Sequence, residues 1–415
     1  MVRFDRQLLI PGWDQARLRG ARVAVCGADW SATFTVWALA SMGIGEIVWI
    51  GRAEGPRAML ADWFLTEPSP FPGVKVSNYP LEVEYGPELE WAVDGGAAAI
   101  VAAHAGPGAF AAARALAARQ GIPLASGSAE CGGWLGLGAP AQPESGEHPA
   151  IAMLVAALLA DSVREHLCPL WGGTAPPGGA LGFEGGSFPR GLKATLVGVG
   201  GIGVYAATAA AALGADLALV DFDRVEETNL NRQGLFGPAD AAAREFKAVA
   251  AARSLLHFFP EREFVAHRQR IPRVAAPRLA GSRAEVLLSA VDNAATRLAL
   301  SSAALELGVP LIQGGTDVFM ADCYTQDPAG VPLDRQMHGA MAEAAAGETS
   351  RPRRRGGCAE NPSYVVPGMT AGALMALRLP DVAKGRRDCP PLHWRSGVLP
   401  VERRDHGFDF ERAAG

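Results

Sequence analysis

The feature that most constrains the fold is a pattern that occurs once in each half of the chain. Each copy has a short apolar run, a glycine-rich turn, an alanine-rich helical stretch and a second apolar run. The first copy starts at Gly20 and ends at residues 46–51, and the second starts at Gly191 and ends at residues 216–221. A buried strand, a tight turn, a helix and another buried strand open a parallel α/β sheet. The repeat therefore predicts two Rossmann-like domains in tandem.

Later landmarks extend the repeat. Each half has a further apolar strand, at residues 97–102 and 285–289, followed by a helix and a short glycine–proline turn. A segment rich in Gly and Pro separates the halves, as expected of a linker. We predict parallel-rich sheets with flanking helices, in a first domain over residues 1–172, a linker at 173–187 and a second domain over 188–415.

The composition narrows the class of protein. The 415 residues carry 38 Lys and Arg against 43 Asp and Glu, a net charge of −5, which predicts neither nucleic-acid nor membrane binding. The apolar stretch at residues 151–159 is too short to span a bilayer. The N-terminus lacks the basic and apolar regions of a signal peptide. We therefore expect a cytoplasmic protein.

The six cysteines are scattered and form no CxxC pair. In a chain of this length that pattern predicts neither a disulfide framework nor a zinc site. The eight histidines show no metal-ligand spacing either, so we expect no zinc.

The second half contains a candidate phosphate site. Its turn, Gly198-Val-Gly200-Gly201-Ile-Gly203, lets backbone N–H groups at a helix start approach a phosphate. Asp221 closes the next strand, where a carboxylate can accept hydrogen bonds from ribose hydroxyls. These features alone fit a nicotinamide-dependent dehydrogenase equally well, and the glycines could form only a tight structural turn.

The stretch after Asp221 separates these alternatives. It reads Asp-Phe-Asp-Arg-Val-Glu-Glu-Thr-Asn-Leu-Asn-Arg-Gln up to Gln233, and Lys247 follows on a helix. A dehydrogenase does not need Asn and Arg here, whereas an adenylating enzyme must neutralise a triphosphate, which Arg232 can do bidentately. The alternatives are a structural salt bridge for Arg232 and an exposed helix lysine for Lys247.

Asp292 follows an apolar strand and precedes Asn293. Carboxyl ends of parallel strands line the ligand crevice, so Asp292 can hold Mg²⁺ against phosphates. It could equally cap the next helix, and the two roles are compatible.

Together these motifs resemble those of the ubiquitin-activating enzyme superfamily, which includes adenylyltransferases of thiamine and molybdopterin synthesis. The resemblance implies ATP and Mg²⁺ as cofactors. It implies that Asp221 binds the ribose, that Asp292 holds Mg²⁺, and that the triphosphate is bound by Asn229, Arg232, Gln233 and Lys247.

The first half resembles the same domain with its site erased. Residues 4–12 resemble the family's opening motif, whose arginine reaches the partner domain's nucleotide, so Arg6 would serve the second half. Trp30 stands in the degenerate glycine turn, and Gly51 replaces the acidic residue at the strand end. An inactive domain followed by an active one resembles the fused arrangement of ubiquitin-activating enzymes, including compact bacterial ones. A homodimer is also possible.

A cysteine supplies the candidate nucleophile. Cys358 lies beside Arg353 to Arg355, in a predicted crossover loop over about residues 328–362. Neighbouring arginines lower a thiol pKa, and the family uses a loop cysteine here for its thioester. Cys358 could also be an ordinary loop residue, and Cys323, in an alternating strand, is expected to be structural.

The expected function is ATP-dependent activation of the C-terminal Gly of a ubiquitin-like protein as an acyl-adenylate. A thioester on Cys358 and transfer to a conjugating enzyme would follow. The main alternative is an adenylyltransferase for a sulfur carrier or a modified peptide, without thioester transfer. A non-catalytic scaffold is a weaker alternative, and residues 381–415 could be a tail or a docking element.

Overall fold

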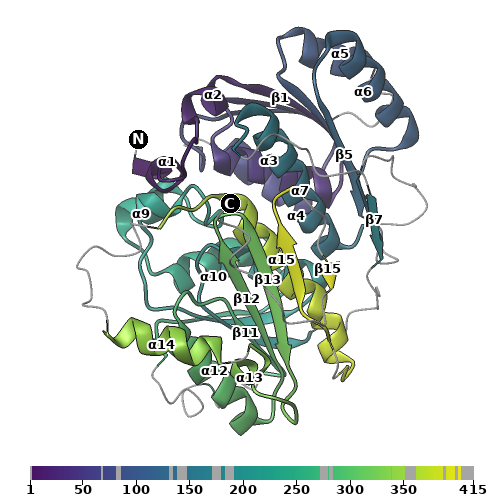
Figure 1. The fold of residues 1–415 in the computed structure, drawn as a ribbon. Helices are drawn as coiled ribbons and strands as arrows, with labels where there is room; N and C mark the ends of the chain where they lie inside the picture. The colour runs from purple at the N-terminus through teal and green to yellow at the C-terminus, as the bar shows by residue number, and fades with distance from the viewer. Residues whose placement is uncertain are drawn as a thin grey trace.

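The two halves of the chain form two sheets, one above the other in Figure 1. The structure is a computed structural model. It describes residues 2–66, 69–80, 86–129, 134–137, 147–170, 179–182, 191–271, 279, 284–337, 339–350, 361–386, 389–397 and 401–402.

The first sheet has, among these residues, seven strands in the order β3-β2-β1-β4-β5-β6-β7. The strands from β3 to β5 pair in parallel, and β6 and β7 are added antiparallel. The strands are β1 (Arg22–Cys26), β2 (Glu46–Ile50), β3 (Lys75–Tyr79), β4 (Ala99–Ala103), β5 (Leu124–Ala129), β6 (Trp134–Leu137) and β7 (Gly179–Gly182). Because β7 falls inside the predicted linker at 173–187, part of that segment extends the first sheet.

The second sheet repeats this topology. Its described strands follow the order β10-β9-β8-β11-β12-β13-β14-β15, parallel as far as β12 and antiparallel beyond it. The strands are β8 (Lys193–Val197), β9 (Asp216–Val220), β10 (Phe264–His267), β11 (Val286–Ser289), β12 (Leu311–Asp317), β13 (Met320–Gln326), β14 (Leu392–Arg395) and β15 (Val401–Glu402). The tandem α/β fold predicted from the sequence is therefore confirmed.

Helices cover both faces of the first sheet. One face carries α5 and α6, and the other carries α3 and α7. The helices of this half are η1 (Val2–Phe4), α1 (Asp5–Leu8), α2 (Gln15–Gly20), α3 (Trp30–Met42), α4 (Pro56–Leu65), α5 (Gly86–Asp94), α6 (Pro107–Gln120) and α7 (Pro149–Leu167).

The second sheet is covered in the same way. One face carries α8, α10 and α15, and the other carries α12 with α13 and α14 beside it. The described helices are α8 (Gly203–Leu213), η2 (Glu227–Asn229), α9 (Pro238–Ala243), α10 (Lys247–Phe258), α12 (Ala294–Leu307), α13 (Leu333–Gln336), α14 (Ala340–Ser350) and α15 (Val365–Ala383).

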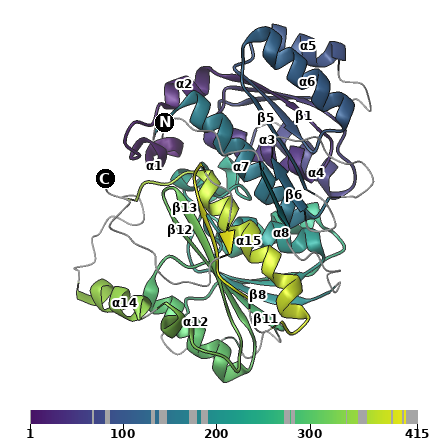
Figure 2. The same ribbon diagram turned by 45° about the vertical axis from the view of Figure 1, so that its right-hand side comes forward.

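The two domains share one apolar core. Between the sheets, α3 and α7 pack against α8 and α15, as Figure 2 shows. Every residue of α3 is buried, as expected of a helix that is apolar on all sides. One hydrophobic cluster runs through all four helices, so the relative position of the domains is fixed by packing.

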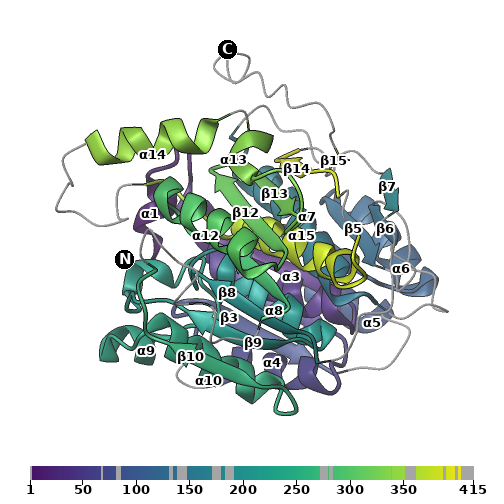
Figure 3. The same ribbon diagram turned by 90° about the horizontal axis from the view of Figure 1, so that it is seen from below.

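The predicted crossover loop at 328–362 is only partly irregular, which corrects the sequence interpretation. It contains α13 and α14, and Figure 3 shows α14 along the outer side of α12. The run Ala340-Met-Ala-Glu-Ala-Ala-Ala has high helix propensity. Met341 anchors it because its side chain is buried against the second sheet's outer cluster.

Replacing Trp37 tests whether the domains unfold together. Its ring lies 5.3 Å from that of Tyr205 in the second domain and 6.2 Å from those of Phe34 and Phe64. Trp37→Ala should lower the free energy of unfolding by about 3–5 kcal/mol, through lost burial and a cavity. Because the core is shared, calorimetry should show one unfolding transition that moves as a whole.

The matched control is Trp91→Ala, because Trp91 is 53% exposed on the outer side of the first domain. It should change the free energy of unfolding by less than about 1 kcal/mol. Two separate transitions, only one of which responds to Trp37→Ala, would contradict a shared core.

Candidate active site

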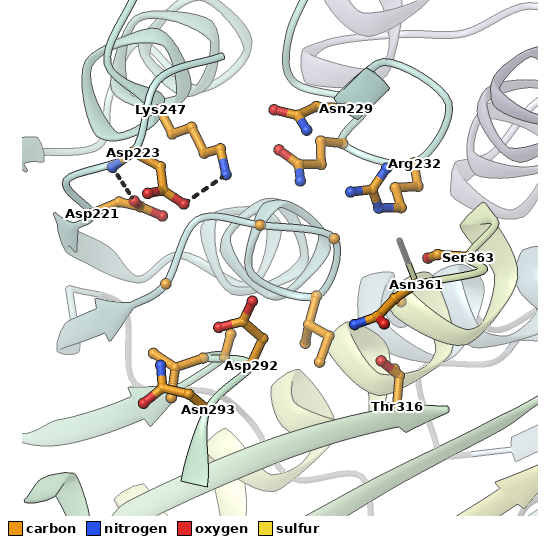
Figure 4. A pocket seen from close by; sticks show the side chains of 18 of the residues that line it. Asp221, Asp223, Asn229, Arg232, Lys247, Asp292, Asn293, Thr316, Asn361 and Ser363 are labelled. Atoms are coloured by element: carbon orange, nitrogen blue, oxygen red, sulfur yellow. Dashed lines mark hydrogen bonds and ion pairs between the residues drawn. The ribbon is translucent and has the colours of Figure 1, made fainter. Parts of the chain in front are cut away.

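A cleft with a volume of about 1850 Å³ lies at the carboxyl ends of β8, β9 and β11. Ligands of open α/β sheets bind at this edge. Its walls come from the glycine turn, the end of β9, the start of α10, the end of β11, the start of α15, and Asn229, Arg232 and Gln233. The first domain adds Arg6 from α1. Figure 4 shows the cleft around the start of α8.

The four glycines of the turn serve two different purposes. Gly198 has φ of +90°, and an added Cβ would lie 2.7 Å from the Ala290 carbonyl oxygen. A Cβ on Gly203 would lie 2.0 Å from the Gly198 carbonyl oxygen. The fold itself requires both glycines, for the turn and for the close start of α8.

Gly200 and Gly201 are not required by packing in this way. A Cβ on either would meet its nearest neighbours at 3.9 and 3.7 Å, in the side chains of Gln233 and Arg232. These are ordinary contact distances, so an alanine would fit at either position without a clash. Both glycines line the cleft, where the absence of a side chain lets a ligand phosphate approach the backbone at the helix start.

Asp221 is 8% exposed and holds the glycine turn against the next loop. Its Oδ2 accepts from Val199 N at 2.7 Å, and its Oδ1 accepts from Asp223 N at 2.8 Å. Burial raises the pKa of this carboxyl, and Lys247 opposes that shift. Both oxygens therefore have fixed positions at the strand end.

Lys247 begins α10 and is largely buried. Its Nζ lies 3.2 Å from Asp223 Oδ2, and Figure 4 shows this pair on the same side of the cleft as Asp221. Asp223 is about half exposed. The structure therefore argues against the alternative of an exposed helix lysine, because the Lys247 side chain is largely buried and lies along the cleft wall in an ion pair.

Arg232 lies on the opposite side of the cleft (Figure 4). Its Nη1 donates to Thr228 O at 2.7 Å and to Asn231 Oδ1 at 2.9 Å. Asn229 Oδ1 accepts from Glu226 N at 3.0 Å and so fixes the start of η2. The loop is thus shaped by its own side chains, and the arginine is held by neutral acceptors.

Two buried polar atoms at the cleft have no hydrogen-bond partner among the described residues. They are Arg6 Nε and Gln233 Oε1, on side chains that are 6% and 3% exposed. Buried polar groups are nearly always paired. Unpaired atoms beside an open cleft therefore indicate groups that a ligand would satisfy.

Asp292 lines the cleft just beyond β11, as predicted, and is exposed. The helix cap falls on its neighbour, because Asn293 Oδ1 accepts from Thr296 N at 2.8 Å. This corrects the alternative role of Asp292 as N-cap. The described residues contain no group of three or more His, Cys, Asp or Glu placed to hold a metal.

The corresponding helix start in the first domain is occupied by the protein itself. The Glu147 carboxylate accepts from Ser31 N at 3.1 Å and from Ser31 Oγ at the start of α3. Trp30 packs on Phe34 and on Phe259, with ring centroids 5.1 and 6.2 Å apart. An internal carboxylate and an indole thus stand where the second domain has open space.

The strand end is altered as well. An added Cβ on Gly51 would lie 2.0 Å from the Gly27 carbonyl oxygen. No side chain fits there, so the carboxylate that Asp221 supplies in the second domain has no counterpart at this position. Gly27 and Gly51 approach each other because neither has a side chain.

Some cleft residues were not found from the sequence. They come from segments far apart in the chain and carry no local motif, as with Thr316 to Val318, Asn361 to Tyr364, Gly368 and Arg270. Phe222 lies inside the quoted motif and is 47% exposed, with the Arg270 guanidinium 5.0 Å from its ring centroid.

Two predictions about cysteines have different outcomes. Cys323 lies buried in β13, where burial raises its thiol pKa to about 12, which makes it unreactive. Cys358 lies outside the described residues, so its role stays a prediction.

Comparison with known proteins now identifies this half of the chain. Residues 189–388 match the model of the ThiF family. The second domain is a ThiF-family domain. The resemblance to the ubiquitin-activating enzyme superfamily is therefore confirmed.

The relatives of this ThiF-family domain are partial matches. The adenylyltransferase and sulfurtransferase uba4 of Aspergillus niger is 37% identical over 133 residues, which are 32% of this chain and 27% of that protein. The adenylyltransferase and sulfurtransferase MOCS3 of Sus scrofa is 30% identical over 250 residues, 56% of this chain and 52% of that protein. The chain thus spans between about a quarter and a half of these relatives.

A crystal structure of E. coli MccB with AMPCPP and MccA covers 51% of this chain and 63% of that chain, with a TM-score of 0.42 and 19% identity.

Among the described residues of the ThiF-family domain and its partner domain, no helix is long and apolar enough to cross a membrane.

The two classes of glycine make a direct prediction about stability. Gly203→Ala should lower the free energy of unfolding by more than about 2 kcal/mol, because its Cβ would overlap a backbone oxygen. Gly200→Ala should change it by less than about 0.5 kcal/mol. Urea denaturation of the two variants measures both effects. Equal destabilisation would show that the turn is purely structural.

Glu147 predicts a pH dependence of stability. Burial raises its pKa to about 8, above the 4.5 of an unperturbed glutamate. The folded state therefore holds a proton that the unfolded state releases, and this contribution is lost as pH rises from about 4.5 to about 8. The slope would be on the order of 1 kcal/mol per pH unit.

Glu147→Gln supplies the comparison, because the amide keeps an oxygen acceptor and cannot titrate in this range. Urea denaturation at pH 5, 6, 7 and 8 should show a smaller loss of stability with pH in the variant. Parallel curves for the two proteins would rule out this assignment.

Proposed function

We propose that the second domain binds ATP and uses it to activate the C-terminal glycine carboxylate of a small ubiquitin-like protein as an acyl-adenylate. The observation that carries this proposal is the cleft, where Arg6, Arg232 and Lys247 line an open glycine turn at a helix start. Converging cations and backbone N–H groups suit a polyphosphate. The relatives uba4 and MOCS3 are named as adenylyltransferases, which supports the proposal.

Different cleft residues would contact different parts of the nucleotide. Asp221 would bind the ribose, since both of its oxygens are held at the strand end. The phosphates would lie over Gly200 and Gly201, which line the cleft without side chains. The triphosphate would contact Asn229, Arg232, Gln233 and Lys247.

Asp292 would hold Mg²⁺, which screens phosphate charge when it is bound. One carboxylate is enough for this purpose, because Mg²⁺ at phosphates commonly uses one or two protein carboxylates and several waters. An exposed carboxylate at the end of β11 fits that need.

The reaction needs positioning more than proton transfer. A carboxylate oxygen of the carrier attacks the α-phosphorus, the bond from that phosphorus to the β-phosphate oxygen breaks, and pyrophosphate leaves. Negative charge gathers on the phosphate oxygens, and Arg6, Arg232 and Lys247 would neutralise it from two sides. The carboxylate is already ionised at neutral pH, so no general base is required.

The carrier tail would enter beside the start of α15. Figure 4 shows Thr316, Asn361 and Ser363 on the side of the cleft where Arg232 lies. An extended tail ending in glycine could reach the α-phosphate along these residues. Its backbone N–H groups are donors of the kind that the unpaired Gln233 Oε1 requires.

A second step is proposed from the sequence. The Cys358 thiolate would attack the acyl-adenylate carbonyl carbon, and the bond to the AMP oxygen would break. The resulting thioester would then pass to the cysteine of a conjugating enzyme. The second candidate, favoured by the word sulfurtransferase in the relatives' names, is activation of a sulfur carrier without this transfer.

The first domain would bind no nucleotide and would supply Arg6. The Glu147 carboxyl group would block its helix start, because it already occupies the place where a phosphate would bind. One chain would then contain one complete site, so a homodimer is not needed to complete it.

Arg232→Ala tests the adenylation site. With Mg-ATP and a candidate ubiquitin-like protein, formation of carrier–AMP should fall by about 100-fold or more, because a charge neutraliser for the α-phosphate is lost. Intact mass spectrometry measures the adduct. The control is Arg119→Ala, since Arg119 is 57% exposed on the first domain and should be dispensable. Full adenylation by Arg232→Ala would refute the assigned site.

Cys358→Ala tests the second step in the same assay. A thiol-sensitive adduct between enzyme and carrier, present in the wild type and absent from the variant, would support thioester formation. Carrier–AMP without such an adduct would favour the sulfur-carrier alternative.

A further inference from the structure

Asn231 joins three segments of the chain through one side chain. It is fully buried. Its Nδ2 donates to Gln7 Oε1 of α1 at 3.0 Å and to the Ser363 carbonyl oxygen at 3.2 Å. Its Oδ1 accepts from Arg232 Nη1 at 2.9 Å. One amide thus bridges the first domain, the loop that carries Arg232 and the start of α15.

The orientation of this amide is fixed by its surroundings. Gln7 is also fully buried, and its Nε2 donates to Gln15 Oε1 at 2.9 Å and to Met42 O at 3.3 Å. Both amide hydrogens of Gln7 are therefore used, and its oxygen is left to accept from Asn231. Trp13 Nε1 donates to Gln15 Oε1 at 3.0 Å and closes the network.

Arg6 and Arg232, two of the arginines that line the cleft, are direct chain neighbours of this bridge. Arg6 precedes Gln7, and Arg232 follows Asn231. The Arg6 carbonyl oxygen also accepts from Ser363 N at 3.1 Å. Since these bonds are buried and mutually satisfied, they specify the relative position of the two backbones more sharply than apolar contacts do.

Asn231 is not among the residues that line the cleft. Any effect it has on a ligand must act through other residues. We propose that Asn231 is a positioning residue whose amide holds Arg6 and Arg232 in one arrangement around the phosphates of a bound nucleotide. This inference rests on the proposed function, and it gives the first domain a specific role at the second domain's site.

Asn231→Asp tests whether the Asn231 amide positions Arg6 through its bridge to the first domain. The carboxylate keeps an oxygen that can accept from Arg232, but it loses both donors and places negative charge against Gln7 Oε1 and Ser363 O. The bridge between the domains is broken while the contact to Arg232 remains. Arg6 should then no longer be held over the nucleotide.

The experiment is a double-mutant cycle on the full chain with Mg-ATP as the ligand, measured by isothermal titration calorimetry. Arg6→Ala and Asn231→Asp should each raise the Kd by about tenfold, the loss of one charge-assisted contact. If Asn231 acts by holding Arg6, the double variant should bind no more than about twofold more weakly than Asn231→Asp alone. Effects that multiply instead would overturn the proposal.

Two further variants keep the test decisive. Gln7→Met breaks the same bridge from the first domain, and it replaces Asn231→Asp in the cycle if that protein does not fold by circular dichroism. Thr208→Val removes a buried hydroxyl that bonds only to Val204 O within α8, among the described contacts. It should leave the Kd for Mg-ATP unchanged. If Thr208→Val raised the Kd as much as Asn231→Asp does, the effect would come from a general loss of packing, and the proposal would be overturned.

The outcomes also separate this inference from the function on which it rests. A wild-type protein that binds no Mg-ATP would overturn the proposed function, and this inference with it. A wild-type protein that binds Mg-ATP equally well with and without the Asn231→Asp change would overturn only the inference.

Discussion

Four helices with almost no polar surface, α3, α7, α8 and α15, pack between the two sheets, and the groups in the cleft depend on that packing. Every residue of α3 is buried, as are the residues of α8 from Gly203 to Ala211. Apolar helices of this kind cannot be left in water, so neither domain would be complete alone. The same packing carries α1 of the first domain to the edge of the second sheet, where Arg6 enters the cleft.

The two domains share one fold, but the helix start after the first strand is open in the second domain and filled in the first. In the second domain the start of α8 is left open, with two glycines that packing does not require. In the first domain the same place is filled by Glu147, which bonds to Ser31, and the neighbouring Trp30 packs on Phe34. A helix start always carries unpaired N–H groups and a positive dipole end. These groups are satisfied by a ligand, by water or by the protein's own side chains, and in the first domain the Glu147 carboxyl group is that partner.

Much of the second site could be predicted because its residues are contiguous. The glycine turn, Asp221 and Arg232 lie within one short stretch, and each has a chemical role that its residue type suggests. Glu147 could not be found in this way. It reaches Ser31 from 116 positions along the chain, and no local pattern distinguishes it from a surface glutamate. The start of α15 was missed for the same reason.

Other differences have local causes. Asp292 and Asn293 are both good helix caps, and only the geometry decides for Asn293. The segment before Cys358 predicts a loop because it is rich in Gly, Ala and polar residues. Gly339, with a φ of +81°, directly precedes α14, which starts at Ala340. A glycine next to a helix indicates its boundary more often than it excludes the helix.

The arrangement of two unequal domains in one chain has a consequence for how the site is assembled. In a symmetric pair each domain would have to keep its own open helix start and also lend its arginine to the other. Fusion removes that requirement, because only one of the two clefts needs to bind a ligand. The first domain can then place a carboxylate at its helix start and use its surface to fix Arg6 and Gln7 against the second domain. The buried amides of Gln7 and Asn231 are polar groups that an apolar core would not need. Their presence at this interface is best explained by the alignment of the two domains at the cleft.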